Sequence, residues 1–171
     1  MVATMGIIME TRSNIIIEEM KRNLVIAIIS LLLTACGGNV VYTQFKSLPV
    51  KGWEADSLVT FEPVINDTLA NYEMQITIRH TDAYPYQNMW LFVGIEKDST
   101  VLLTDTIEFY LANDRGEWLG GGLTVKELPL LYRENHQFAN SGTYRITLQQ
   151  GMREETLKGI TEVGVQILSK E

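Results

Sequence analysis

Hydrophobic and polar residues alternate along much of the chain beyond residue 50, and a period of two predicts half-buried β-strands. The alternation is clearest at residues 72–79, where polar side chains occupy one face. The other face carries four large apolar side chains, Tyr72, Met74, Ile76 and Ile78. Residues 142–149 alternate in the same way. One face of the last predicted strand is apolar as well, with Val163, Val165 and Ile167.

Three further segments between residues 56 and 116 predict strands. Residues 89–95 form a nearly unbroken apolar run, which is typical of a central strand. Residues 101–111 form a longer strand, and Asp105 falls on its apolar face, so we expect a β-bulge there. The sequence Asn-Asp-Arg-Gly at 113–116 predicts a hairpin turn. A shorter strand is expected at 56–61, with Leu58 on the outer face.

The region between residues 118 and 142 gives weaker signals. We expect Trp118 to open a strand that the three glycines at 120–122 weaken. Such glycines typically mark a bulge or a close approach of another backbone segment. Thr124, Glu127 and Pro129 predict at most one short helical turn. No long amphipathic helix is indicated anywhere in this region.

About seven or eight short strands, separated by turn signals, indicate an all-β fold. We predict an antiparallel β-sandwich of the Greek-key or immunoglobulin-like type, and a closed β-barrel is the alternative. The Gly-Thr-Tyr sequence at 142–144 resembles the tyrosine corner of Greek-key sandwiches.

The sequence Leu-Thr-Ala-Cys at 33–36 has the form of a lipobox, the signal for lipid attachment to a cysteine. Lys21 and Arg22 supply the charged start of a signal peptide, and about ten mostly apolar residues follow. This run is shorter than the roughly 20 residues that span a bilayer. We therefore expect cleavage before Cys36 and a lipid anchor on its thiol. The alternative is a free cysteine buried in a core helix.

These signals divide the chain into four parts. Residues 1–19 do not fit a signal peptide, and we interpret them as a misassigned start or an N-terminal extension. Residues 20–35 are the predicted lipoprotein signal peptide, residues 36–50 a lipidated tether, and residues 51–171 the β-sandwich domain. Gly-Gly-Asn at 37–39 lacks an acidic run that would direct the protein to the cell surface. We therefore expect anchoring in the outer membrane, facing the periplasm.

The composition excludes several classes of function. The formal net charge of −7 argues against nucleic acid as a partner, because phosphate binding requires clustered basic residues. A single cysteine provides neither a disulfide framework nor a thiolate metal site. His80 and His136 have no other strong ligand at metal-binding spacing, and no nucleophile motif is present. We therefore expect no enzymatic activity and no cofactor.

Aromatic residues in the predicted loops are candidates for a binding surface. We expect contact with a protein partner through Tyr84, Tyr86, Trp118 and Arg153. The alternative function is a glycan-binding β-sandwich, which predicts a row of exposed aromatic side chains on one face. Most of the three tryptophans are expected in the core. A hydrolase would need paired carboxylates or a nucleophile beside a base, and the sequence singles out neither.

Asp-Ser or Asp-Thr pairs occur at four positions that resemble an O-glycosylation signal of exported proteins in surface-gliding bacteria. The predicted acceptors are Ser57, Thr68, Ser99 and Thr106. The alternative interpretation is that these pairs cap turns at strand ends, where their side-chain oxygens accept backbone hydrogen bonds.

An ordered set of short motifs follows the lipobox and covers essentially the whole mature domain. The motifs are Val-Tyr at 41–42, Gly-Trp at 52–53, Asp-Ser at 56–57, Ile-Arg at 78–79, Tyr-Pro-Tyr-Gln-Asn at 84–88, Leu-Phe-Val at 91–93, Gly-Glu-Trp-Leu-Gly at 116–120, Gly-Thr-Tyr at 142–144, Gln-Gly-Met-Arg at 150–153 and Gly-Ile-Thr-Glu-Val-Gly at 159–164. Their order and spacing resemble the gliding-motility lipoprotein family GldH. The Val-Lys-Glu-Leu sequence at 125–128 departs from the pattern expected there.

The resemblance implies an envelope lipoprotein that is required for surface movement and linked to the motility and secretion machinery. It implies no enzymatic activity. The only residue with an implied chemical role is Cys36, the lipid attachment point, and the implied partners are the membrane and other motility or secretion proteins of the envelope.

Overall fold

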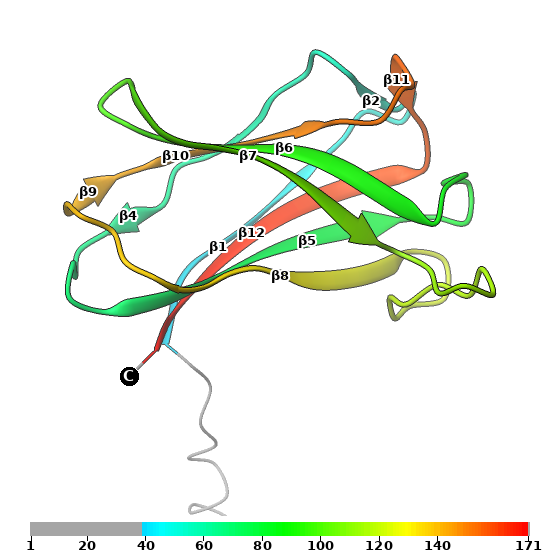
Figure 1. Ribbon diagram of the computed structural model, residues 1–171. Helices are drawn as coiled ribbons and strands as arrows, with labels where there is room; N and C mark the ends of the chain where they lie inside the picture. Colours follow the sequence, from blue (N-terminus) through cyan, green and yellow to red (C-terminus); the bar gives the residue numbers. More distant parts are fainter. Residues whose placement is uncertain (1–38, 171) are drawn as a thin grey trace, which may run out of the picture. The chain divides into compact units, whose positions relative to one another are not determined.

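The computed structural model describes residues 39–170, and all regular secondary structure in this range is β-strand. The first sheet has four strands in the order β1 (Asn39–Ser47), β12 (Ile160–Lys170), β5 (Asn71–His80) and β8 (Lys126–His136). The second sheet has the order β3 (Val59–Phe61), β10 (Arg145–Gln150), β6 (Asn88–Lys97) and β7 (Thr100–Tyr110). Figure 1 shows these two layers. All neighbouring strands are antiparallel.

Two short ladders complete the described part of the fold. They pair β2 (Trp53–Glu54) with β11 (Thr156–Leu157), and β4 (Val64–Ile65) with β9 (Gly142–Thr143). Neither four-stranded sheet closes on itself, so the prediction of an antiparallel β-sandwich is confirmed. The described range contains no α-helix that could serve as a membrane-spanning segment.

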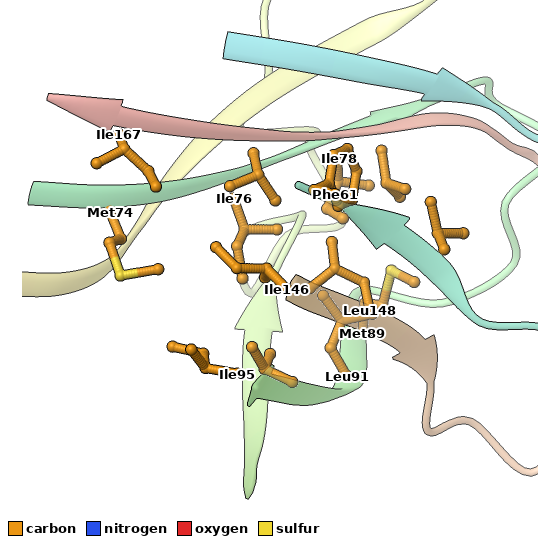
Figure 2. Packing of buried hydrophobic residues seen from close by; sticks show 14 of the residues in the cluster. Phe61, Met74, Ile76, Ile78, Met89, Leu91, Ile95, Ile146, Leu148 and Ile167 are labelled. Carbon is orange, nitrogen blue, oxygen red and sulfur yellow. The ribbon is translucent and has the colours of Figure 1, made fainter. Parts of the chain in front are cut away.

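The core lies between the facing sides of the two sheets. β5 and β12 contribute alternate residues such as Met74, Ile76 and Ile167 from one layer, and β6 and β10 contribute Leu91 and Ile146 from the other (Figure 2). Each of these side chains is at most 1% exposed. Burial of a side chain of this size contributes about 1.5–3 kcal/mol. This alternation is the one predicted for residues 72–79 and 163–167, and both strands are confirmed.

β6 lies between β10 and β7, so the central strand predicted at 89–95 is confirmed, and the structure corrects two other expectations for the second sheet. β6 alternates in burial, so Trp90 and Phe92 point to solvent although the whole segment is apolar. In β7 the bulge lies at Leu102, because Ile95 pairs with Leu103 and Glu96 with Val101. No bulge occurs at Asp105, which pairs regularly with Val93.

Asp105 instead forms an ion pair that links the two sheets. Its carboxylate lies 3.2 Å from the Arg133 guanidinium of β8, and both side chains are about one-third exposed. β7 and β8 are edge strands of different sheets. An inward-pointing charge on an edge strand disfavours pairing with further strands. The pair therefore explains a charged residue on the apolar face of β7.

Strand β8 differs most from the prediction for residues 118–142. Residues 126–136 form a strand rather than a helical turn, and Trp118 makes only an isolated bridge to Ala112. Pro129 is tolerated because β8 lies at a sheet edge. The glycines at 120–122 do mark a close approach: a Cβ on Gly120 would lie 2.8 Å from the Glu127 carbonyl oxygen. The turn at 113–116 is confirmed by the hydrogen bond from Gly116 N–H to Asn113 O.

An edge strand of the first sheet lies within the segment expected as a tether. Residues 39–47 form β1, which pairs with β12 along its whole length. Phe45 packs on Gly164, where a Cβ would lie 2.6 Å from the ring. The segment expected as a tether at 36–50 therefore contains a strand of the domain. The strand expected at 56–61 is shorter, and Leu58 is exposed as predicted.

Tyr144 forms the predicted tyrosine corner. Its side chain is 1% exposed, its hydroxyl donates to the Asn140 carbonyl oxygen at 2.7 Å, and the Asn140 N–H donates back at 3.3 Å. The ring also packs edge-on against Phe138, with 4.6 Å between the ring centroids. These contacts fix the connection that leads from β8 to β10.

Substitution of Tyr144→Phe is expected to destabilise the domain by about 0.5–1.5 kcal/mol, because it removes the two hydrogen bonds between the buried Tyr144 hydroxyl and the Asn140 backbone. Equilibrium denaturation measures the change. Tyr110→Phe is the matched control, since Tyr110 is 61% exposed and is expected to leave the stability unchanged. Equal stability of the two variants would contradict a structural role of the Tyr144 hydroxyl.

Candidate functional site

A groove lies beside the start of β6, where the loop after β10 folds against this strand. The Gly151 N–H donates to the Trp90 carbonyl oxygen at 2.7 Å, and the Trp90 N–H points at the Met152 sulfur at 3.3 Å. The groove has a volume of about 360 Å³. We call it the aromatic–arginine groove, and its lining residues are Tyr86, Asn88, Trp90, Gly151, Met152 and Arg153.

Hydrogen bonds hold the polar side chains around this groove. The Tyr86 hydroxyl donates to the Glu154 carboxylate at 2.6 Å, and this bond raises the pKa of Tyr86 above its ordinary value. Asn88 donates to the Glu108 carboxylate at 2.5 Å. Arg153 is exposed, and within the described residues its guanidinium has no ion-pair partner. The groove therefore combines an aromatic wall with a free cation.

The aromatic wall continues along the outer face of β6. Trp90 is 38% and Phe92 is 42% exposed, and Gly151 packs against both side chains. Glu108 pairs with Trp90, and Thr106 pairs with Phe92 on the neighbouring strand. Residues two positions apart on a strand lie about 6.6 Å apart on the same face. Two large aromatic surfaces are thus presented side by side next to carboxylate, amide and hydroxyl groups.

The four residues predicted for partner contact lie near one another, but they are not equally exposed. Tyr86 and Arg153 line the groove. Tyr84 is 2% exposed, and its hydroxyl donates to the Asn88 carbonyl oxygen at 2.7 Å, so it is a core residue. Its ring packs edge-on against the ring of Tyr86. Trp118 is half-buried, and its ring lies 6.5 Å from that of Tyr84. The structure therefore removes Tyr84 from the set of surface residues.

His80 is buried beneath the loops that carry Tyr84 and Trp118. Its ring contacts Trp118 with 4.5 Å between the centroids, and its Nε2 has no hydrogen-bond partner within the described residues. Burial lowers the pKa of His80, and burial also lowers the pKa of His136. Residues 39–170 contain no group of histidine, cysteine and carboxylate side chains that is arranged to hold a metal ion.

The predicted O-glycosylation sites differ in accessibility. Ser57, Ser99 and Thr106 are exposed, whereas Thr68 is half-buried. Ser99 lies in the β6–β7 hairpin turn with a positive φ of 62°. The acidic neighbour of Thr106 is engaged with Arg133, and the neighbour of Thr68, Asp67, accepts hydrogen bonds from two backbone N–H groups. Cys36, the predicted lipid attachment point, lies outside the described residues.

Comparison with known proteins identifies the family. The family model described as "GldH lipoprotein" matches residues 40–167. The chain belongs to the GldH lipoprotein family. It is 33% identical over 161 residues to the gliding motility lipoprotein GldH of Flavobacterium johnsoniae, which covers 90% of this chain and 99% of that one. It is 37% identical over 145 residues to a GldH homolog of Christiangramia forsetii, covering 80% and 88%.

Solved structures are only distantly similar to this GldH family member. A 4-O-methyl-alpha-glucuronidase aligns with a TM-score of 0.45 and 9% identity, over 80% of this chain and 18% of the enzyme. A family 35 carbohydrate binding module from Clostridium thermocellum aligns with a TM-score of 0.34 and 11% identity, over 76% and 98%. These scores are too low to carry an argument about function.

Of the six residues that line the groove in this GldH protein, the sequence predicts only Tyr86 and Arg153 as site residues. Trp90 was expected to be a core residue with most tryptophans, and Asn88 and Met152 were not singled out. The available signal was the parity of β6: if Met89 and Leu91 face the core, Trp90 and Phe92 must face outward. Because both faces of β6 carry apolar residues, the sequence shows no alternation that would reveal which face points outward.

The unfolding free energy is expected to fall as the pH is lowered from 7 toward 5. His80 and His136 have lowered pKa values in the folded protein, so the unfolded chain binds protons first, at about pH 6.5. The two neutral histidines therefore contribute their full share of the unfolding free energy above about pH 6.5. This contribution is lost as the pH falls toward their lower pKa values in the folded protein. Denaturation at a series of pH values measures the slope. His80→Phe should flatten it, and an unchanged slope in this variant would contradict the role of His80.

Proposed function

We propose that the protein is a non-enzymatic accessory lipoprotein of the bacterial gliding apparatus and its associated secretion machinery. It acts by protein–protein contact while a lipid on Cys36 anchors it in the outer membrane, facing the periplasm. Membership of the GldH lipoprotein family supports the role in motility and the membrane anchor. The lipobox at 33–36 supports Cys36 as the attachment point.

The observation that carries the contact mechanism is the aromatic–arginine groove. Protein interfaces are enriched in Tyr, Trp and Arg at the positions that contribute most binding energy. Tyr86, Trp90 and Arg153 supply all three residue types around one hollow. Because Arg153 has no ion-pair partner in the described part of the chain, an acidic side chain of a partner gains a charge-assisted hydrogen bond there.

Deletion of the gene in its native host is expected to abolish surface spreading and to reduce protein secretion. The wild-type copy restores both, whereas Cys36→Ser does not, because the unanchored domain diffuses away from its partners. Spreading assays and immunoblots of secreted proteins measure the outcome. Full activity of a stably expressed Cys36→Ser protein would contradict the anchored mechanism, and unaffected spreading in the deletion strain would contradict the role in motility.

The second candidate function is glycan binding, and the exposed pair Trp90 and Phe92 on one sheet face favours it. Aromatic rings of this kind stack on the apolar faces of sugar rings, and Glu108 and Gln149 lie beside them to accept or donate hydrogen bonds. This candidate predicts that the purified protein binds envelope polysaccharides and that Trp90→Ala and Phe92→Ala each weaken binding at least tenfold. Leu131→Ala on the other sheet is the control, and calorimetry that detects no binding to any polysaccharide removes the candidate.

O-glycosylation is a further proposed modification, and the structure allows the four acceptors to be ranked. Ser57 and Ser99 are exposed beside exposed acidic residues, so they are expected to be modified first. Asp105 faces Arg133, which makes Thr106 a poorer acceptor. The intact mass of the native protein is expected to exceed that of the lipidated chain by whole glycan increments, and Ser57→Ala should remove one increment. A native mass equal to the bare lipidated chain would contradict the modification.

A further inference from the structure

The point where the chain enters the β-sandwich distinguishes its two ends. Asn39 at the start of β1 pairs with Ser169 of β12, and Ser169 pairs with Tyr72 near the start of β5. Tyr72 in turn pairs with His136 at the end of β8. These four residues therefore form a row across one end of the first sheet (Figure 1).

The β6–β7 hairpin of the second sheet belongs to this same end. The Phe138 ring lies 5.3 Å from Tyr72 of the first sheet and 4.6 Å from Tyr144, which precedes β10. Residues 97–102 of the hairpin border a hollow together with residues 139–141 and Tyr144. We call this the anchor end, and it consists of the start of β1, the tip of the β6–β7 hairpin at residues 97–102 and the connections at 66–70 and 137–141.

The aromatic–arginine groove lies at the opposite end, which we call the far end. At this end Ser47 pairs with Glu162, and His80 pairs with Ile160. His80 contacts Trp118 and Tyr84, and Tyr84 contacts Tyr86 of the groove. β5 runs from the anchor end to the far end over 10 residues, which corresponds to roughly 30 Å.

The sequence before β1 limits how far the anchor end can move from the lipid. Only Gly37 and Gly38 separate Cys36 from Asn39, so three residue steps of at most about 3.6 Å each span the gap. The acyl chains that the proposed function places on Cys36 would insert into the bilayer and keep this residue at the headgroup level. Asn39 is therefore held within about 11 Å of the membrane surface.

The anchor end carries exposed apolar side chains that suit a lipid surface. Val40 is 58%, Leu69 is 87% and Val101 is 60% exposed, and they lie on three separate segments of this end. The charges near this end are of both signs. Lys97 is paired with Asp98 and Lys170 with Glu73 and Glu134, while Asp67 adds an exposed carboxylate, so the basic groups balance only part of the acidic ones.

We propose that the anchor end rests on the membrane surface and that the far end displays the aromatic–arginine groove about 30 Å away from it. This inference rests on the lipidation of Cys36 in the proposed function. The bilayer is the partner of the anchor end, because the short segment between Cys36 and β1 leaves no room for a protein domain between them. The partner of the groove must then approach from the aqueous compartment beyond the membrane surface, and not from within the bilayer.

Fluorescence quenching at matched positions tests this orientation. The thiol of lipidated Cys36 is blocked, so a single new cysteine in the full-length lipoprotein can be labelled selectively. Leu69→Cys reports on the anchor end and Leu123→Cys on the far end, where these leucines are 87% and 95% exposed. A second matched pair is Val101→Cys and Leu119→Cys, which are 60% and 52% exposed. Each labelled protein is reconstituted in vesicles that contain lipids with nitroxide-labelled headgroups.

The expected result is at least threefold stronger quenching at residues 69 and 101 than at residues 119 and 123. Equal quenching at all four positions, or stronger quenching at the far end, would overturn the orientation. Intact mass of the reconstituted protein is measured in parallel. A mass without the lipid would refute the anchor at Cys36, so failure of the proposed anchor is distinguishable from failure of the orientation.

Discussion

The burial of one face of each sheet against the other is the interaction on which the rest of the structure depends. Strands β5, β12, β6 and β10 direct every second side chain inward, and the resulting core is fully apolar at its centre. Because the chain has a single cysteine, which lies outside the described domain, apolar packing replaces the disulfides that stabilise many small exported domains. The ion pair between Asp105 and Arg133 adds a polar link only where the two edge strands β7 and β8 approach.

The same alternation determines where binding can occur. Residues that do not face the core must face solvent, so an apolar strand such as β6 necessarily presents Trp90 and Phe92 on the outside. The loop after β10 then turns this aromatic row into a groove, because Gly151 lacks a side chain and packs directly on both residues. A second glycine, Gly159 at a φ of 86°, lets the backbone at residues 83–84 approach and seats the Tyr84 ring beneath Tyr86. Core packing and the functional surface are therefore built from the same strands.

The sequence predicted the features that follow from a strict period of two or from local turn chemistry. The strands at residues 72–79 and 163–167 and the tyrosine corner at Tyr144 are confirmed for this reason. The predictions were wrong where tertiary position overrides local preference. Pro129 is compatible with β8 only because that strand lies at an edge, and Asp105 is compatible with the inner face only because Arg133 lies opposite. The burial of Tyr84 next to a half-buried Tyr86 likewise depends on contacts with distant segments.

The most direct test of the account is the spreading of a deletion strain that carries the anchored protein with both Trp90→Ala and Arg153→Glu. Both side chains are at the surface, so the variant is expected to fold, to remain lipidated and to fail in spreading because the groove no longer binds its partner. The matched control is Leu131→Ala with Arg115→Glu, an exposed apolar residue on the other sheet and an exposed arginine that does not line the groove. Loss of spreading in the first strain and normal spreading in the second is the predicted result. Normal spreading in both strains would contradict the central claim.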